Sequence, residues 1–337
     1  MSTARLIAVP RPVLLLFCLV VSFFQDCPAA SDPFPSPAPG AFRVLSWNVS
    51  QENLFKFADR YRAMFRIANP DLLLLDEIQG GRTQTEVAAV LSGVRGTNDT
   101  QWNILIGSAG GYQRPGIISR LPIEPIADLD GLRYPEADIA ALKSMVPESK
   151  WTTRVQRSLE AGIPAVGAVV RLGDRTILAV AVDLQCCNDT NDWPEVRRQI
   201  EAREIRRALQ QTLEKRRVDA VLIAGDLNLV GGNKPLETLT APYPEPHRSL
   251  ATANAVQLDG LELWTWDGRG SAFPSGRLDY SFYTPSSLQA RRSVVLTTED
   301  LNAEILSAHA LNPGTSRELS DHLPVIVDYE WRISRRD

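Results

Sequence analysis

Four short fragments, far apart in the chain, each place an acid, an amide or an imidazole beside an apolar run. They are Leu45-Ser46-Trp47-Asn48, Leu75-Asp76-Glu77, Gly225-Asp226-Leu227-Asn228 and Ser320-Asp321-His322. This pattern is typical of a sheet whose strands deliver polar groups to one edge. Carboxylates gathered there would repel one another unless a divalent cation lay among them. The fragments therefore indicate metal-assisted chemistry on an anionic substrate, and a phosphate ester fits best.

The residue types within these fragments suggest separate roles. Glu77 follows an apolar strand and precedes two glycines, so it is a natural ligand for Mg²⁺, which prefers oxygen. Asp226 and Asn228 lie two residues apart, which places both side chains on one face of an extended chain. His322 lies beside an aspartate at the start of a strand. A hydrogen bond from His322 to Asp279 would fix the tautomer of the ring and support its charged form.

The spacing of apolar residues predicts the elements that position these groups. The expected elements are strands at 42–49, 71–78 and 218–224 and helices at 57–68, 83–91 and 194–216. A series of short strands with turns between 102 and 184 favours antiparallel pairing. Within it, 130–157 is polar, and we expect an irregular segment that covers the site entrance. No internal repeat interrupts 42–331, so one domain is expected there, followed by a tail at 332–337.

Taken in chain order, five motifs resemble those of the endonuclease/exonuclease/phosphatase family, which includes pancreatic-type deoxyribonucleases, abasic-site endonucleases, neutral sphingomyelinases and inositol polyphosphate 5-phosphatases. The motifs are those around Asn48, Glu77, Asp226-Leu227-Asn228, Asp279 and Asp321-His322. The resemblance spans about residues 42–331. It implies an α/β fold, a four-layer α/β sandwich of two mostly antiparallel, mixed sheets flanked by helices. It also implies Mg²⁺ or Mn²⁺ and hydrolysis of a phosphate ester by in-line attack of water.

The resemblance implies which residues bind the metal. Glu77 would bind it, and Asp321 and Asn48 would help to hold it or the phosphate. Two arginines, Arg114 and Arg157, lie in segments within reach of the substrate, and guanidinium groups suit phosphate oxygens. Most surface arginines have no such role. We therefore treat substrate binding by these two arginines as an expectation.

The resemblance also implies the catalytic roles. Asp226 would position or deprotonate the attacking water, and Asn228 would hold a phosphoryl oxygen. His322, paired with Asp279, would stabilise charge on the phosphorus or share the role of base. The metal would polarise the phosphoryl group and neutralise developing negative charge.

Two positions depart from the family pattern. Many members have a histidine that acts as general acid on the strand before the long helix, and here Asp183 stands in its place. Asp183 could donate a proton if burial and neighbouring carboxylates raised its pKa. Alternatively it is a further metal ligand, or it marks a protein that has lost activity. The second departure is Asp76, where the family usually has Gln; Asp76 either coordinates a metal too or caps the turn.

The first thirty residues are expected to be an export signal outside the fold. Arg5 and Arg11 precede an apolar run at 13–24, which small residues follow. The run is shorter than the roughly 20 residues that a membrane span needs. We therefore expect cleavage, no stable membrane span, and a secreted or periplasmic protein; an uncleaved N-terminal anchor is the alternative. Residues 31–41 carry four prolines and are expected to form a flexible leader.

Charge and cysteine content narrow the class of protein. Lys+Arg 36 against Asp+Glu 40 is mildly acidic, which argues weakly against a nucleic-acid substrate. The one dense basic stretch, 197–217, is interleaved with glutamates and predicts a solvated helix face. Cys186 and Cys187 offer no disulfide framework, so the core must supply the stability.

Together these features predict an exported, divalent-metal-dependent phosphoesterase that acts as a monomer on a phosphodiester or a phosphomonoester. Two alternatives remain at this stage. One is an extracellular endonuclease or exonuclease. The other is a non-catalytic relative that binds a phosphate ligand and has lost the general-acid histidine. The sequence leaves open whether the substrate is a nucleic acid, a phospholipid or a small molecule.

Overall fold

The computed structural model describes residues 33–94, 101–146, 148, 151–187 and 192–332. The expected export signal at 1–30 and the tail beyond residue 332 lie outside these ranges. The described residues belong to one compact unit. No helix within the described ranges combines the length and the apolar character that a bilayer crossing requires.

The strands form two mixed sheets. The first has the order β10-β12-β13-β1-β2-β4-β3 and the second the order β5-β6-β7-β8-β11-β9. The neighbours β1/β2, β7/β8 and β10/β12 are parallel, and the other neighbours are antiparallel. The strand bounds are β1 Ala41–Gln51, β2 Leu72–Gln79, β3 Asn103–Ile106, β4 Gln113–Ser119, β5 Ile123–Pro125, β6 Ala165–Leu172, β7 Arg175–Asp183, β8 Ala220–Asp226, β9 Ala251–Thr252, β10 Val256–Gln257, β11 Asp279–Tyr283, β12 Leu288–Val295 and β13 Val325–Trp331.

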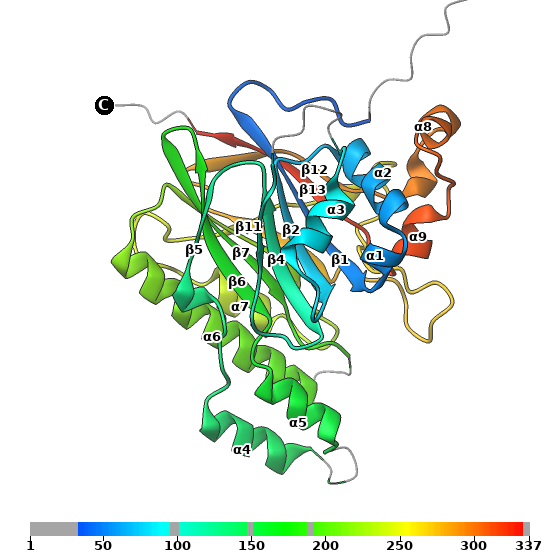
Figure 1. The fold of residues 1–337 in the computed structure, drawn as a ribbon. Coiled ribbons are helices and arrows are strands. Elements are labelled where there is room, and N and C mark those ends of the chain that lie inside the picture. The colour runs from blue at the N-terminus through cyan, green and yellow to red at the C-terminus, as the bar shows by residue number, and fades with distance from the viewer. Residues whose placement is uncertain (1–32, 95–100, 147, 149–150, 188–191, 333–337) are drawn as a thin grey trace, which may run out of the picture. The chain divides into compact units, whose positions relative to one another are not determined.

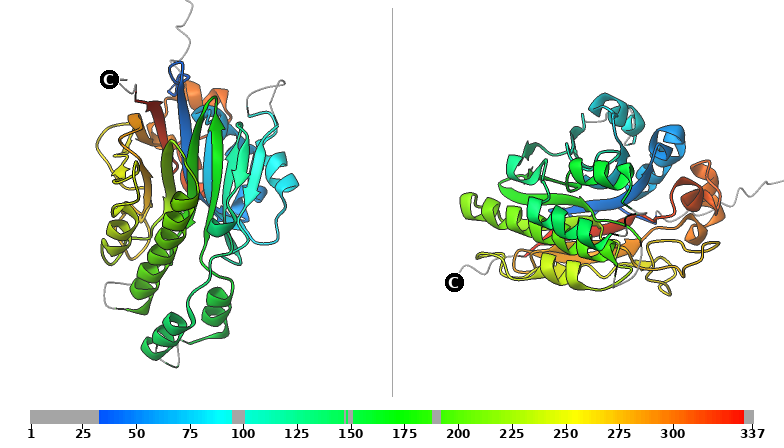
Figure 2. Two further views of the ribbon diagram at one scale, coloured as in Figure 1. Left: turned by 90° about the vertical axis from the view of Figure 1, so that its left-hand side faces the viewer. Right: turned by 90° about the horizontal axis from the view of Figure 1, so that it is seen from below.

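Helices cover the outer faces of the sheets, as Figure 1 shows, and the two sheets face each other, as the views in Figure 2 show. This arrangement is the four-layer sandwich that the sequence resemblance implied, so the expected fold class is confirmed. The helices are α1 Asn53–Lys56, α2 Ala58–Ala68, α3 Gln84–Leu91, α4 Glu136–Met145, α5 Thr153–Glu160, α6 Trp193–Lys215, α7 Lys234–Thr240, α8 Ala303–Ala308 and α9 Thr315–Leu319.

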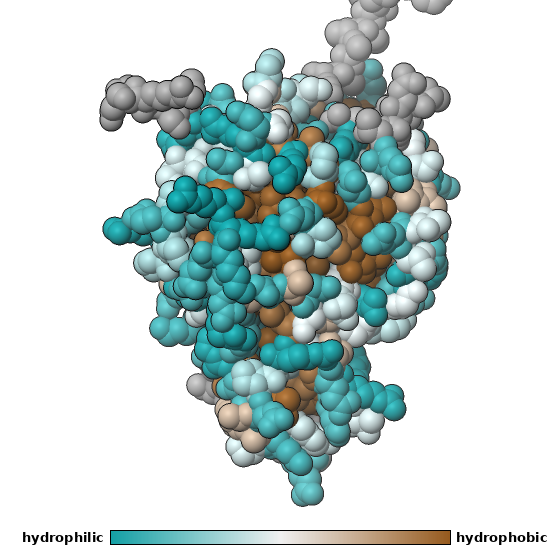
Figure 3. Space-filling model, turned by 60° about the vertical axis from the view of Figure 1, so that its left-hand side comes forward, coloured by the Kyte–Doolittle hydropathy of each residue, from teal (hydrophilic) through white to brown (hydrophobic). Residues whose placement is uncertain are grey.

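Side chains alternate in direction along the central strands, and this alternation builds two separate apolar layers. In β7, Leu178 and Val180 pack towards helix α6, where they join Ile205 in one core cluster. The intervening Ala179 and Ala181 point to the other sheet and belong to the cluster between the sheets. Small residues there let the two sheets approach closely. On the face that Figure 3 shows, hydrophilic residues dominate the surface and hydrophobic residues are visible between them.

One expectation from the sequence is wrong in this part of the molecule, and another holds only in part. The segment 130–157 is not irregular, because it contains helix α4 and most of α5. Each of these helices buries a single residue, Leu142 or Leu159, and is otherwise largely polar, so its sequence resembles that of an exposed segment. The basic stretch on α6 is a solvated face only in part: Arg203, Arg207 and Lys215 are exposed, but Arg197 and Arg198 are buried and paired with glutamates one turn away on the same helix.

The described part of the expected leader, 33–41, contacts the domain. Phe34 is fully buried, and the guanidinium of Arg43 donates to the carbonyl oxygens of Phe34 and Pro35. The same guanidinium forms a buried ion pair with Asp328. Strand β1 begins at Ala41 and pairs there with Glu330. The domain therefore includes residues that the sequence placed before it.

Candidate functional site

The sheet topology brings the polar fragments to one edge. Strands β7 and β8 are parallel, so Asp183 and Asp226 lie opposite each other in register where both strands end. Strand β11 runs antiparallel to β8, and its first residue, Asp279, also lies opposite Asp226. In the other sheet, β1 and β2 are parallel, and Asn48 lies opposite Asp76. Five polar residues from five strands thus meet without any long loop.

Irregular backbone at this edge redirects the side chains. The register of β2 shifts between Leu75 and Ile78, and that of β1 shifts between Asn48 and Gln51. Glu77 has a φ of 54°, in the left-handed region that residues with a Cβ rarely adopt. Such a bulge turns a side chain away from the normal alternation. It lets Asp76 and Glu77 serve the same site although they are neighbours in a strand.

His322, Asp279 and Asp226 form a buried group. The Nδ1 atom of His322 lies 2.9 Å from Oδ2 of Asp279, and its Nε2 lies 3.6 Å from Oδ2 of Asp226. The hydroxyl of Thr265 donates to the same oxygen of Asp279 at 2.6 Å. Burial by itself lowers the pKa of His322, but Asp279 and Asp226 outweigh it and raise that pKa well above its ordinary value. The two neighbouring carboxylates therefore favour the charged form of the ring, in agreement with the predicted pairing with Asp279.

Asp226 is held by amides as well as by His322. The backbone N–H of Asn228 donates to Oδ1 of Asp226 at 2.8 Å, and the side-chain amide of Asn228 donates to Oδ2 at 2.9 Å. Asn48 Nδ2 lies 3.5 Å from the same Oδ2. Burial raises the pKa of Asp226 to about 8, against the opposing effect of His322. The hydrogen bonds therefore fix the orientation of the Asp226 carboxylate, and its raised pKa lies close to neutral pH.

Asp76 and Asp183 form a second group with Asp226. One carboxylate oxygen from each of the three lies within 4.8 Å of the others, and all three side chains are buried. Burial is the largest cause that raises the pKa of Asp183 well above its ordinary value, followed by Glu77 and Asp226. Burial likewise raises the pKa of Asp76, with Asp183 next in effect. These shifts show an excess of buried negative charge.

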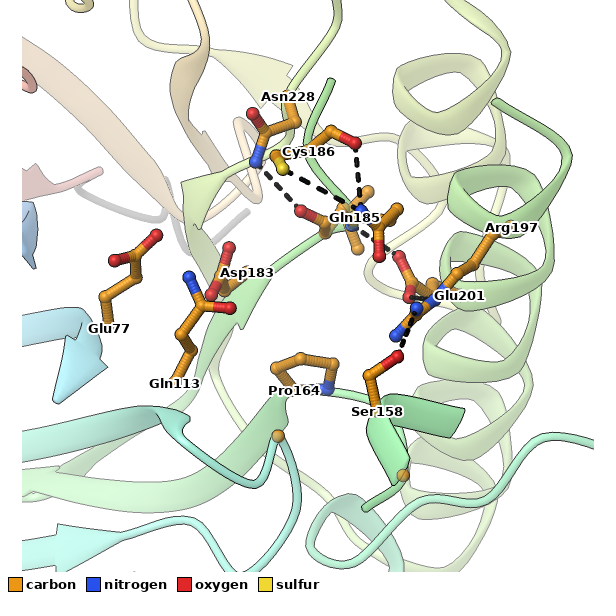
Figure 4. A pocket seen from close by; sticks show the side chains of 13 residues that line it. Glu77, Gln113, Ser158, Pro164, Asp183, Gln185, Cys186, Arg197, Glu201 and Asn228 are labelled. Atoms are coloured by element: carbon orange, nitrogen blue, oxygen red, sulfur yellow. Dashed lines mark hydrogen bonds and ion pairs between the residues drawn. The ribbon is translucent and has the colours of Figure 1, made fainter. Parts of the chain in front are cut away.

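A cavity of about 80 Å³ opens beside this group. Glu77, Gln113 and Asp183 line one side of it, as Figure 4 shows, and Ser158 of α5 lies on the side of α6. Gln51 donates to Oε2 of Glu77 at 3.2 Å. The cavity is larger than a single water needs. Sequence reasoning missed Gln113 and Ser158, because neither lies in a motif and Ser158 belongs to a segment that was expected to be irregular.

Three expected site residues are not brought into these groups. Asp321 is exposed, and its Oδ2 accepts a hydrogen bond from the indole of Trp266 at 2.9 Å. Arg114 is half-buried on β4, and its neighbour Gln113, not Arg114, lines the cavity. Arg157 is exposed on α5, and again its neighbour Ser158 lines the cavity. Neither arginine lines the cavity, and a role of either in holding substrate stays a prediction.

The donor atoms at this edge fit a divalent cation. They are carboxylate oxygens and an amide oxygen, which suit Mg²⁺ and Mn²⁺ better than softer metals. Neither oxygen of Asp76 has a hydrogen-bond partner among the described residues, although the side chain is fully buried. A buried carboxylate without a partner is costly, and a bound cation would compensate it.

Comparisons with known proteins agree with this geometry. A crystal structure of an endonuclease/exonuclease/phosphatase from Bacteroides vulgatus superposes with a TM-score of 0.54 at 16% identity, covering 87% of this chain and 99% of that one. The human Nocturnin catalytic domain with bound sulfate gives 0.52 at 13% identity, covering 87% and 94%. D. rerio TDP2 in complex with a single-strand DNA product gives 0.51 at 16% identity, covering 86% and 99%. These likenesses establish the fold.

Sequence comparison supplies the family. No curated protein sequence matches this chain. The profile of the Endonuclease/Exonuclease/phosphatase family, however, matches residues 45–322, which include every strand-end residue described above. The chain belongs to the endonuclease/exonuclease/phosphatase family.

Proposed function

We propose that this protein is an exported phosphoesterase that depends on Mg²⁺ or Mn²⁺ and hydrolyses a phosphate ester by in-line attack of water. The observation that carries the proposal is the buried group in which Asp279 holds His322 at 2.9 Å and His322 faces Asp226. A charged imidazole and a carboxylate with raised pKa, side by side and next to Asn228 and Asp183 of the cavity wall, suit acid–base and electrostatic catalysis.

Each side chain would have a defined task in this reaction. Asp226, whose carboxylate two amide groups orient, would position the attacking water and accept its proton. The imidazolium of His322 would donate a hydrogen bond to a phosphoryl oxygen and stabilise the charge that develops there. Glu77 would hold the cation with Asn48. When bound, the cation polarises the phosphoryl group and lowers the energy of the negative charge.

Asn228 keeps an orienting role. Its side-chain amide already donates to Asp226 and to the carbonyl oxygen of Leu184. We therefore propose that Asn228 fixes Asp226, and that any contact with a phosphoryl oxygen is made only after one of these bonds is given up.

The activity has a direct test. Full-length protein or its mature form should hydrolyse bis-p-nitrophenyl phosphate with Mg²⁺ or Mn²⁺, and EDTA should abolish the release of nitrophenol. Glu77→Gln should lower the rate by about 10²-fold or more, because it removes a charged ligand of the cation. Asp174→Asn is the matched control, since this carboxylate lies exposed in the turn between β6 and β7. Full activity in EDTA, or in Glu77→Gln, would refute the assignment.

An extracellular nuclease is the second candidate. It draws support from the fold shared with D. rerio TDP2, whose structure contains a single-strand DNA product. The formal net charge of -4 opposes it, because proteins that bind nucleic acid commonly present basic surface. Parallel assays on plasmid DNA and on sphingomyelin vesicles would separate a nuclease from a lipid phosphodiesterase. Binding of a phosphate ligand without turnover of any ester would instead indicate the non-catalytic relative.

Export is part of the proposal and is supported by the sequence of residues 1–30. A basic start, a short apolar run and small residues describe a cleaved signal. The protein recovered from the medium or periplasm should begin near residue 31, at about the end of that segment. Recovery of the intact N-terminus in the membrane fraction would support the uncleaved anchor instead.

A further inference from the structure

Asp226 is shared by two different groups of buried side chains. On one side it faces His322, which Asp279 holds. On the other side it meets Asp76 and Asp183, with one oxygen of each within 4.8 Å of the others. Only the first group contains a cationic side chain. The second group consists of three carboxylates, so it needs a different source of positive charge.

Asp76 is the residue that points most directly to a ligand. Its side chain is 0% exposed, and neither of its oxygens has a hydrogen-bond partner within the part of the chain that the structure describes. By contrast, Asp226 accepts bonds from amides and Asp279 accepts bonds from Thr265 and His322. A buried carboxylate with both oxygens unpaired, facing two further carboxylates, is unfavourable unless a cation or a proton compensates it.

The balance of charge around the site argues for more than one cation. Four buried aspartates and the half-buried Glu77 stand against the single imidazolium of His322. One divalent ion would leave this edge strongly negative in a medium of low dielectric constant, and two divalent ions would balance it. The nearby Arg197 does not help, because Glu201 already pairs with it at 3.0 Å.

We propose that Asp76, Asp183 and Asp226 form a second divalent-cation site, separate from the ion that Glu77 holds. The ligands are hard oxygens, so the site should accept Mg²⁺, Mn²⁺ or Ca²⁺. Asp183 is then a metal ligand, not a proton donor to the leaving group. The two departures from the family pattern, Asp76 and Asp183, have one common explanation in this site. The inference rests on the proposed function for the ion that Glu77 holds, but it does not require that the protein hydrolyses an ester.

The test counts bound ions. Full-length or mature protein, stripped of metal, is titrated with Mn²⁺, and the free ion is measured by electron paramagnetic resonance. We expect two Mn²⁺ per chain in the wild type and one in Asp76→Asn. Glu77→Gln should also retain one, and the double variant none. Asp174→Asn, the exposed control, should retain two. Asp183→Asn should retain one as well, because an amide is a weaker ligand of a hard cation than the carboxylate that it replaces.

The outcomes separate this inference from the proposed function. One Mn²⁺ in both the wild type and Asp76→Asn would overturn the second site, and would mean that the three aspartates share a proton, while the phosphoesterase proposal would stand. Loss of both ions in Asp76→Asn would also overturn it, because the two ions would then form one cluster. No bound Mn²⁺ in the wild type would remove both proposals. Circular dichroism of each variant shows whether a lost ion reflects a lost fold.

Discussion

Replacing His322 with alanine is expected to lower the turnover of bis-p-nitrophenyl phosphate by about 10²–10³-fold, the usual effect of removing one preorganised donor to a developing oxyanion. The imidazolium is the cationic side chain that faces Asp226, at 3.6 Å, and Asp279 fixes its orientation. Because the ring acts in the transition state, kcat should fall more than KM rises. Steady-state kinetics at saturating Mn²⁺ measure both constants.

The partner variant Asp279→Asn distinguishes catalysis from structure. The amide can still orient the ring, but it no longer supports the positive charge of His322. The pKa of His322 should therefore fall. As the pH is raised, the variant should lose activity at a lower pH than the wild type does, because its ring loses the proton earlier. His309→Ala, outside the cavity and both carboxylate groups, serves as the histidine control. An unchanged kcat in a folded His322→Ala protein would assign this histidine a structural role only.

The residues that meet at the sheet edge could be predicted because each follows or precedes an apolar strand. Asp226 and Asp279 illustrate the reason: buried strands such as 218–224 are recognisable by continuous apolar residues, and their ends expose polar groups at one edge. The pairing of His322 with Asp279 was predicted on the same basis, and the structure places the two atoms 2.9 Å apart. The gathering of polar groups at one edge therefore follows from strand ends, whereas the four-layer fold was implied by the resemblance of the motifs to a known family.

The structure adds what local pattern does not contain. Asp76 continues the buried face of Leu72 and Leu74, but the bulge in β2 redirects Glu77, and no residue type in Leu75-Asp76-Glu77 signals that bulge. The positions of Arg114 and Arg157 depend on which face of β4 and α5 lies towards the cavity, and that is set by the pairing of distant segments. The buried pair of Arg197 and Glu201 resembles a surface pair in sequence, because spacing within a helix is the same in both cases.

The same excess of negative charge makes a prediction about stability. In EDTA, the melting temperature should fall as the pH rises between about 4 and 8. Burial raises the pKa of Asp226 from 3.8 to about 8, and it raises the pKa of Asp76 and Asp183 as well. A raised pKa in the folded state means that the folded protein binds the proton more tightly than the unfolded chain does. This contribution is fully present below the ordinary pKa and is lost as the pH rises through the folded value. The raised pKa of His322 acts in the same direction.

Divalent cations should reverse this trend, because they bind the ionised carboxylates and stabilise only the folded state. With saturating Mn²⁺ the gain in melting temperature should therefore be small near pH 5 and large near about pH 8, where the protons have left. Asp226→Asn should flatten the pH dependence measured in EDTA, since it removes a group shared by both clusters, whereas Asp174→Asn should leave it unchanged. Thermal unfolding followed by circular dichroism gives all of these values. A melting temperature in EDTA that rises steadily with pH would show that the buried aspartates are ionised without cost, and the case for cations at this edge would lose its physical basis.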